Sequence, residues 1–282
     1  MTETISGRGR MVMLAGAPGI GKTRTAQELV SHASNLGAQT FWGWCYEQEG
    51  SPPYWPWVQP IRSYIQRTDP KILGVQMGPG AADICEIIPE LLDQLPDLEP
   101  PSSLEPELAR FRLFESIATF LKNIAQNQSL VLVLDDLQWA DQPSLLLLEF
   151  LARQVPDSKI MLVGTYRDVG VNRAHPLSNT LARLARSEAY HREELSGLES
   201  EHVGRLIKDV SGVEPSEDLI RAVFSHTEGN PFFTAEVIRL LAERWQTPGQ
   251  STDGPPGSSQ DPLEVGSLGE MEIPQSVLEV IG

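Results

Sequence analysis

Eight consecutive residues near the start of the chain have the types and spacing that bind phosphate. Residues 16–23 read Gly-Ala-Pro-Gly-Ile-Gly-Lys-Thr and match the phosphate-binding loop pattern G-x-x-x-x-G-K-[ST]. The apolar residues 11–15 precede this loop, and a helix-patterned stretch follows it. Because a strand, a glycine loop and a helix in this order are the context of a working loop, a chance match is a poor explanation. The sequence therefore predicts a site for a phosphate-bearing ligand.

The chemistry of the phosphate-binding loop gives each residue type a reason. Gly16, Gly19 and Gly21 let the backbone curl so that its N–H groups point at an anion. Lys22 places a compact positive charge on the β- and γ-phosphates, and the Thr23 hydroxyl can ligate Mg²⁺. The helix that begins here adds the positive end of its dipole. The predicted nucleotide-binding residues in this region are Gly16, Ala17, Pro18, Gly19, Ile20, Gly21, Lys22, Thr23 and Arg24.

A second pattern supplies the metal and water side of such a site. Residues 130–134 form a continuous apolar run that ends in Asp135 and Asp136, the pattern called Walker B. Asp135 can hold Mg²⁺ through water, and Asp136 can polarise an attacking water. Alone, a strand followed by two aspartates often marks only a strand end that meets solvent. Together with the phosphate-binding loop it predicts phosphoryl-transfer chemistry, which depends on positioning and charge stabilisation.

An arginine closes the third apolar strand, at residues 163–168. Strands of one parallel sheet present their carboxyl ends to the same crevice, so Arg167 is a candidate sensor of the γ-phosphate. The alternative is a surface ion pair with Asp168 or Asp141, which would contribute little to stability. The predicted catalytic residues are Asp136, Lys22 and Arg167, and the predicted metal ligands are Thr23 and Asp135.

The composition argues against several classes of protein. With 38 acidic and 22 basic residues the net charge is −16, whereas a domain that grips nucleic acid directly is expected to be basic. Cys45 and Cys85 form neither a disulfide framework nor a metal-ligand spacing. The polar first residues predict no signal peptide, and the apolar patch at 145–148 is far shorter than the ~20 residues of a membrane span. We expect a cytoplasmic protein without membrane contact.

Strands that alternate with helices predict a three-layer α/β/α fold with a parallel sheet, followed by a small helical lid domain. We assign residues 1–197 to the core, 198–245 to the lid, 246–272 to a flexible linker and 273–282 to the truncated start of a further domain. The expected strands are 11–15, 40–45, 130–134, 160–164 and 190–195, and the expected helices are 22–36, 107–126, 201–210, 216–226 and 231–245.

Residues 46–106 resemble an insertion between the second and third strands. Within it, residues 51–57 read Ser-Pro-Pro-Tyr-Trp-Pro-Trp. One interpretation is a proline-stiffened loop whose aromatic rings cover the edge of the core. The other is a partner-binding or base-stacking surface that uses Trp55 and Trp57. Residues 83–107 are acidic and broken by proline, which predicts short helices and loops on the surface.

Residues 229–231, Gly-Asn-Pro, have a structural explanation that needs no ligand. Asn230 is a good N-cap residue, and Pro231 suits the first position of a helix.

The motifs occur in an order that resembles a known family. They are residues 16–23, Leu-Asp-Asp-Leu-Gln-Trp-Ala-Asp at 134–141, Gly-Thr-Tyr-Arg-Asp at 164–168 and Thr-Glu-Gly-Asn-Pro-Phe-Phe at 227–233. This combination resembles the signal-transduction (STAND) branch of AAA+-related P-loop ATPases. More closely, it resembles the origin-recognition-like AAA ATPase module of large bacterial regulators that carry LuxR-type, cyclase or kinase domains. The resemblance covers residues 10–245, and the block at 135–141 is its most specific part.

The resemblance implies a P-loop NTPase fold, with ATP or ADP and Mg²⁺ as cofactors. The implied roles are phosphate binding for Lys22, metal binding for Thr23 and Asp135, base-side catalysis for Asp136 and γ-phosphate sensing for Arg167. Pro231 resembles the lid proline that packs on adenine in related switch ATPases, a role that competes with the capping explanation.

We expect a signal-transduction ATPase that hydrolyses ATP slowly to ADP and phosphate and acts as a nucleotide-dependent regulatory switch, for instance in transcription regulation. Its expected partners are the nucleotide and regulatory domains or proteins, with no direct nucleic acid contact; the resemblance also admits a nucleotide-dependent oligomer. One alternative is a scaffold or interaction module with a degenerate nucleotide site. Another is a different P-loop enzyme, such as a small-molecule kinase or a transporter ATPase. The transporter signature begins at 195–197 but breaks off, and it lies after the Walker B strand.

Overall fold

The structure is a computed structural model that describes residues 1–47, 50–99 and 101–246 of the chain. The expected linker at 246–272, apart from its first residue, and the expected further domain at 273–282 lie outside these residues. The strands are β1 (Arg10–Gly16), β2 (Gln39–Trp44), β3 (Leu130–Asp135), β4 (Ile160–Arg167) and β5 (Tyr190–Glu194). The helices are α1 (Thr2–Ile5), α2 (Lys22–Asn35), α3 (Trp55–Ile65), α4 (Pro70–Met77), η1 (Gly78–Gly80), α5 (Ala81–Cys85), α6 (Leu91–Gln94), α7 (Pro106–Asn127), η2 (Leu137–Trp139), α8 (Gln142–Gln154), α9 (Pro176–Leu184), α10 (Ser200–Ser211), α11 (Glu217–Thr227) and α12 (Pro231–Gln246).

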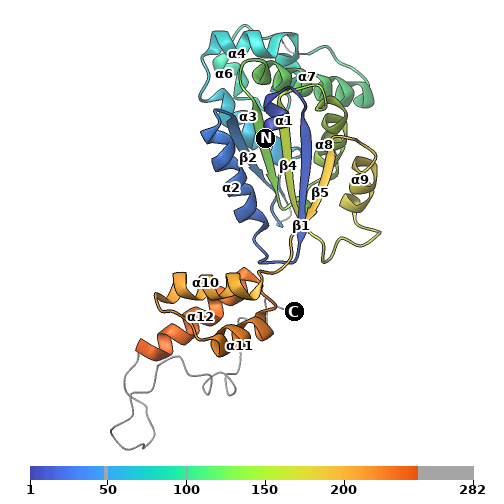
Figure 1. Cartoon of the computed structure of the whole chain (residues 1–282). Coiled ribbons are helices and arrows are strands. Elements are labelled where there is room, and N and C mark those ends of the chain that lie inside the picture. Colours follow the sequence, from blue (N-terminus) through green and yellow to red (C-terminus); the bar gives the residue numbers. More distant parts are fainter. Residues whose placement is uncertain (48–49, 100, 247–282) are drawn as a thin grey trace, which may run out of the picture. The chain divides into compact units, whose positions relative to one another are not determined.

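The five strands form one parallel sheet in the order β2-β3-β4-β1-β5 (Figure 1). This confirms the predicted α/β class with its parallel sheet. Strand β4 lies between β1 and β3, so it separates the strand before the phosphate-binding loop from the Walker B strand. In register, Gly16 of β1 lies opposite Arg167 of β4, and Leu134 of β3 lies opposite Gly164. The carboxyl ends that carry the predicted site residues therefore meet at one edge of the sheet.

Helices cover both faces of the sheet, because the strand residues are apolar on both sides. In β1, Met11 and Met13 belong to a large cluster with residues of α3, α7 and α8, whereas Leu14 belongs to a smaller one with Ala26 of α2. Strand β3 is buried along its whole length, which explains its unbroken apolar sequence. The layers are therefore α2, the sheet, and the group of α3, α7 and α8 (Figure 1).

The first interpretation predicted a loop over the whole aromatic-proline segment, residues 51–57. This is wrong in part, because α3 begins at Trp55. Pro56 lies in the first turn, where a missing N–H costs nothing. Trp57 is fully buried, and its indole N–H donates to the Ser144 carbonyl at 3.1 Å. The alternative of a partner-binding surface that uses Trp57 is therefore wrong, and the segment covers the core.

The helix α3 lies directly against β2. A Cβ atom at Gly43 would come within 1.8 Å of the Pro56 carbonyl oxygen, so only glycine fits at this point of the strand. Pro60 stands four residues after Pro56 inside the same helix. Because proline has no N–H, Pro60 cannot give the Pro56 carbonyl its helical hydrogen bond.

The acidic stretch after residue 83 contains short helices, as predicted, but it is not confined to the surface. Ile84, Ile88 and Leu91 are fully buried. The Asp83 carboxylate is buried too, paired with Arg112 at 2.7 Å and bonded by the Ser116 hydroxyl at 2.7 Å. The acidic composition suggested a surface segment, but a carboxylate that is paired and hydrogen-bonded can be buried.

Residues 195–246 form a helical unit with a core of its own. Its helices, α10, α11 and α12, lie close to their predicted bounds and enclose a small apolar cluster. The cluster contains Val203, Ile207, Leu219, Val223, Ile238 and Leu241.

The chain divides into two compact units. One contains Met1–Gly16 and Lys22–Glu194, and the other contains Ala17–Gly21 together with the helical residues from Leu195 onward. We call them the sheet unit and the helical unit. The sequence predicted a boundary after residue 197, but it did not predict that the centre of the phosphate-binding loop groups with the helices. Within the described part of the chain, no helix has the length and apolar character to cross a bilayer.

Candidate functional site

The two ends of the phosphate-binding loop lie in the sheet unit, at the end of β1 and the start of α2. The Lys22 side chain is buried, and its ammonium donates a hydrogen bond to the Gly16 carbonyl at 2.9 Å. Gly16, Gly19 and Gly21 have φ values of 147°, 74° and 101°, which L side chains rarely adopt. The glycines therefore occupy the positions where the backbone requires them, as the sequence predicted.

A network of hydroxyl groups holds the buried carboxylate of Asp135. Thr23 Oγ1 lies 3.0 and 3.2 Å from its two oxygens, and Thr165 Oγ1 lies 2.5 Å from Oδ1. Thr23 is the second residue of α2, Asp135 ends β3, and Thr165 lies near the end of β4. The sheet thus brings together the two predicted metal ligands, Thr23 and Asp135, which lie far apart in the sequence.

Asp136 follows with a left-handed backbone, at φ 59° and ψ 47°. Its N–H donates to Thr165 Oγ1 at 2.9 Å, and its Oδ1 accepts from the Gln138 amide at 2.9 Å. The side-chain carbonyl oxygen of Gln138, Oε1, accepts from the backbone N–H of Arg167 at 3.0 Å. Sequence reasoning did not select Thr165 or Gln138 as site residues. Both residues lie within motifs that carry the family resemblance, at 134–141 and 164–168, but the role of Thr165 depends on β3 and β4 being neighbours.

The candidate sensor Arg167 is half-buried at the end of β4. Among the described residues, its side chain forms no ion pair with Asp168 or Asp141. Asp141 instead caps α8, where it accepts from the Ser144 N–H at 2.9 Å. Arg24, which we had placed among the nucleotide-binding residues, is exposed and pairs with Glu28 at 2.5 Å along α2.

The charges of the site act on one another. Burial lowers the pKa of Lys22, and the like-charged Arg167 adds to this, while the Asp136 carboxylate opposes it. Burial raises the pKa of Asp135, and the neighbouring Asp136 adds to this, while the hydrogen bond from Thr165 opposes it. An anion bound beside Lys22 would favour its charged form, since opposite charges stabilise each other.

The residues present fit Mg²⁺ together with a nucleotide. Thr23 and Asp135 offer the hard oxygen donors that Mg²⁺ prefers, already in contact with each other. Among the described residues, no group of three or more His, Cys, Asp or Glu side chains could hold a metal by itself. Mg²⁺ is commonly bound by one or two carboxylates plus the phosphates of its nucleotide.

Within the helical unit, the centre of the phosphate-binding loop contacts the start of α12. The Asn230 side-chain amide donates to the Pro18 carbonyl at 2.9 Å, and the Phe232 N–H lies 3.4 Å from the Gly19 carbonyl. A side chain at Gly19 would come within 2.8 Å of Phe232 Cβ. Asn230 Oδ1 also accepts from the Phe232 N–H at 3.1 Å, which confirms its role as an N-cap.

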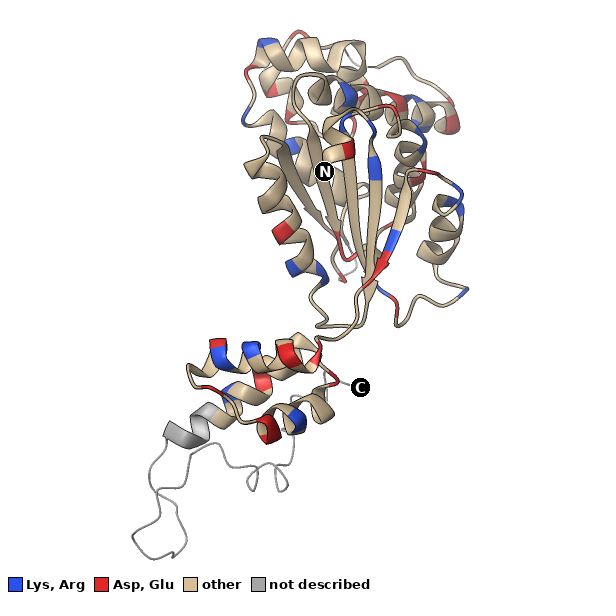
Figure 2. Cartoon of the chain, viewed as in Figure 1, with Lys and Arg blue, Asp and Glu red and all other residues tan. Residues whose placement is uncertain are grey.

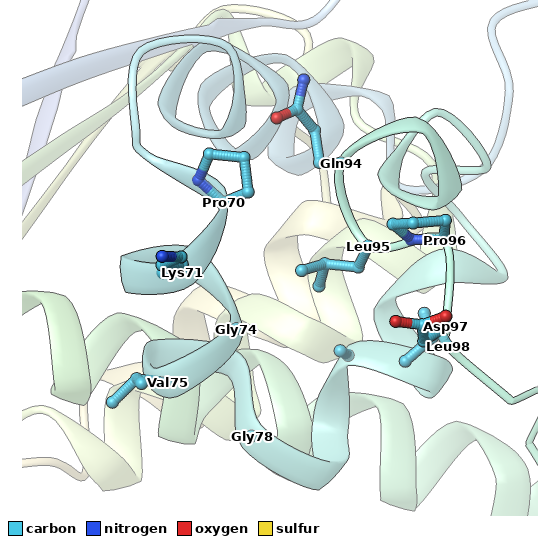
Figure 3. A pocket seen from close by; sticks show the side chains of 11 residues that line it. Pro70, Lys71, Gly74, Val75, Gly78, Gln94, Leu95, Pro96, Asp97 and Leu98 are labelled. Carbon is cyan, nitrogen blue, oxygen red and sulfur yellow. The ribbon is translucent and has the colours of Figure 1, made fainter.

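A separate cavity of about 600 Å³ lies on the insertion, beside α4 (Figure 3). Leu95 extends toward the helix, and a Cβ atom at Gly74 would meet its side chain at 3.5 Å. None of the predicted nucleotide-binding residues lines this cavity.

The family follows from a comparison of the sequence with models of known families. Residues 1–163, more than half of the chain, match the model of the AAA ATPase domain. The chain belongs to this AAA ATPase domain family. The match includes the phosphate-binding loop and the Walker B strand, but it ends before Arg167 and Asn230. Membership implies a nucleotide site, which in AAA ATPases typically includes Mg²⁺.

The solved structures that are similar to this AAA ATPase domain protein have low sequence identity to it. A point mutant of Thermotoga maritima RuvB is 13% identical with a TM-score of 0.45, over 86% of this chain and 58% of that one. A STAND protein with a tetratricopeptide repeat sensor from Pyrococcus horikoshii is 15% identical with a TM-score of 0.45, over 90% and 29%. The Drosophila ORC bound to DNA is 15% identical with a TM-score of 0.35, over 69% and 84%. This chain thus spans less than two thirds of the length of the RuvB and STAND chains. No curated protein matches the sequence.

Proposed function

We propose that this protein is a regulatory ATPase that binds ATP or ADP with Mg²⁺, hydrolyses ATP slowly and uses the bound nucleotide as a switch. The observation that carries the proposal is the contact of Thr23, Asp135 and Thr165 at one edge of the sheet, beside the buried Lys22. In a member of the AAA ATPase domain family, Lys22, Thr23 and Asp135 are of the residue types that bind the phosphates and Mg²⁺ of a nucleoside triphosphate.

Each residue has a task in this proposal. Lys22 and the loop amides bind the phosphates, and Thr23 and Asp135 hold Mg²⁺, which supplies charge neutralisation on the phosphate oxygens. The Asp136 carboxylate accepts a hydrogen bond from the attacking water and so orients it as a general base. The positive charge of Arg167 lowers the pKa of Lys22, so the two cations repel each other. A γ-phosphate bound near both would relieve this repulsion, and this supports Arg167 as its sensor.

The switch requires that the helical residues respond to the nucleotide. The Asn230 amide and the Phe232 N–H both contact loop carbonyls, so a change in the loop changes the start of α12. A nucleotide can shift such an equilibrium only if it binds one arrangement more tightly than the other. Pro231 at the first position of α12 remains our proposal for a contact to the adenine base, in addition to its place in the helix.

The proposal extends to partners. We infer that regulatory domains or proteins receive the switch signal, in signal transduction or transcription regulation, and that nucleotide-dependent assembly with further copies is a route for it. Lys and Arg are spread over many elements and interspersed with Asp and Glu (Figure 2), so we infer no direct contact with nucleic acid.

A binding measurement tests the nucleotide site. Titration calorimetry with Mg-ATP and Mg-ADP should give a dissociation constant for the chain, and Lys22→Ala should weaken it at least tenfold, about 1.4 kcal/mol. Lys71→Ala removes an exposed lysine on α4 and should bind as the wild type does. Equal binding by Lys22→Ala, or no binding by the wild type, would refute the proposal.

The same preparations test turnover. Phosphate release should be slow in the wild type and at least tenfold slower in Asp136→Asn, with nucleotide affinity retained. Asparagine is the suitable replacement because it tolerates the left-handed backbone of residue 136.

A further inference from the structure

Gln138 is a buried side chain that joins the ends of two neighbouring strands. It is 8% exposed, and both ends of its amide are bonded. The orientation of the amide follows from its partners: the Arg167 N–H can only donate, and the Asp136 carboxylate can only accept. The carbonyl of Gln138 must therefore face Arg167, at 3.0 Å, and its NH₂ must face Asp136, at 2.9 Å.

The backbone at Asp136 needs such support. Residue 136 has one of three positive φ values among the described non-glycine residues. Sparsely populated conformations of this kind persist when their surroundings hold them in place. Two contacts do so here: the Asp136 N–H donates to Thr165 of β4, and the carboxylate accepts from Gln138.

The two partners of Gln138 belong to different parts of the predicted chemistry. Asp136 is the carboxylate assigned to the attacking water, and Arg167 is assigned to the γ-phosphate. Since the glutamine carbonyl bonds the backbone N–H of Arg167, a displacement of the end of β4 moves the amide that fixes the Asp136 carboxylate. The chain thus contains a direct physical connection, one side chain long, between these two groups.

We propose that Gln138 is a positioning residue that sets the orientation of the Asp136 carboxylate according to the position of Arg167. This inference rests on the proposed function, because it assumes that Asp136 orients the attacking water. Gln138 touches no substrate in this scheme and acts through Asp136. Its loss misplaces the carboxylate during catalysis and leaves the phosphate and metal contacts of Lys22, Thr23 and Asp135 in place.

We call the two hydrogen bonds of the Gln138 side chain, to Asp136 and to the Arg167 N–H, the Gln138 bridge. Two substitutions test its two bonds separately. Gln138→Met has similar length and removes both hydrogen bonds. Gln138→Glu keeps the acceptor for the Arg167 N–H but faces Asp136 with a second carboxylate, which repels it. Gln142→Met is the matched control, because Gln142 begins α8, lies close in sequence and is exposed.

The first measurement needs no nucleotide. Hydrogen exchange at the Arg167 amide should become at least tenfold faster in Gln138→Met, while Gln138→Glu and Gln142→Met should keep the wild-type rate. An unchanged rate in Gln138→Met would mean that the bridge does not exist in solution and would overturn the proposal.

The second measurement separates chemistry from binding. Both Gln138 variants should lower kcat for phosphate release at least tenfold, while their dissociation constants for Mg-ADP stay within twofold of the wild type. Circular dichroism at the assay temperature checks that they are folded. A purely structural role would instead lower stability and change binding and kcat together, or change neither, and either result overturns the proposal.

The outcome also distinguishes this inference from the proposed function. If the wild type binds and hydrolyses ATP but the Gln138 variants keep the wild-type kcat, only the positioning role fails. If the wild type releases no phosphate, the hydrolytic part of the proposed function fails and the positioning role with it. The exchange rate of the Arg167 amide then still reports whether the bridge forms.

Discussion

At the scale of single residues, the candidate site is organised around a buried carboxylate held by two hydroxyl groups. Thr165 is fully buried, donates to Asp135 and accepts from the Asp136 N–H, so one side chain serves both carboxylate residues. A hydroxyl that connects two charged or polar partners in a buried position is costly to remove, because both partners lose a bond that water cannot replace.

We expect Thr165→Val, which keeps the shape and removes the hydroxyl, to lower the free energy of unfolding by about 1–3 kcal/mol. It should also weaken Mg-nucleotide binding or slow phosphate release at least tenfold. Urea unfolding and the assays above measure these effects.

Thr180→Val is the matched control for this prediction. Thr180 is also fully buried, and its hydroxyl donates to the buried Glu149 carboxylate at 2.7 Å, in a contact between α9 and α8. It should cost similar stability and leave the nucleotide assays unchanged. Equal effects of both variants on nucleotide binding and turnover would contradict a specific role of Thr165.

At the scale of elements, the start of α12 combines two tasks: it caps a helix and it contacts the phosphate-binding loop. Asn230 caps the helix and bonds the Pro18 carbonyl. Ser216 caps α11 by accepting from the Leu219 N–H at 3.2 Å, and it has no bond to the phosphate-binding loop. A comparison of Asn230 with Ser216 therefore separates the effect of helix capping from the effect of the contact with the phosphate-binding loop.

We expect Asn230→Ala and Ser216→Ala to destabilise the helical unit by similar amounts, about 1 kcal/mol each, as lost N-caps do. Only Asn230→Ala should change the affinity for Mg-ATP relative to Mg-ADP. Thermal unfolding and calorimetry provide the two readouts. If Ser216→Ala shifts the nucleotide preference equally, the contact with Pro18 has no special part in the switch.

The sequence predicted all five strands of the sheet. β1, β3 and β4 read as apolar runs, as buried parallel strands do, whereas β2 and β5 gave weaker signals. The prediction was wrong at α3, where proline residues suggested a loop. Pro56 occupies a first-turn position that tolerates proline, whereas Pro60 lies inside the helix at the cost of one hydrogen bond. The sequence also did not predict α9, whose short sequence begins with Pro176 after a histidine cap. Lys22, Thr23 and Asp135 could be proposed as site residues from the sequence because their motifs are local. Thr165 was not, because its task depends on which strands are neighbours, and no local pattern contains that order.

At the scale of the whole molecule, the charge of −16 sets the long-range field in which the nucleotide site must work. A nucleotide is itself an anion, so its site needs local cations against this field. In the proposed function, Lys22 and Arg167 supply them at the carboxyl edge of the sheet. A nucleic acid backbone would instead require many cations over an extended surface.

We therefore expect that this chain does not retain a short DNA duplex in a gel-shift experiment at low salt, with either Mg-ATP or Mg-ADP present. The electrostatic repulsion between two strongly negative molecules is the reason. A shift that disappears as salt is raised would contradict this expectation.

The close approach of Pro56 to Gly43 makes a strand and the helix that follows it in the sequence depend on each other. A helix that places a carbonyl oxygen 1.8 Å from where a Cβ atom would stand can dock only on a strand that already has glycine there. Once the helix is docked, a mutation of that glycine forces the helix away from the sheet, with Trp57 on it. Pro60 adds to this dependence, because the carbonyl it leaves without a helical partner is the same one that lies over the glycine. The glycine therefore has to be present before the helix can dock, and it cannot be replaced while the helix stays docked.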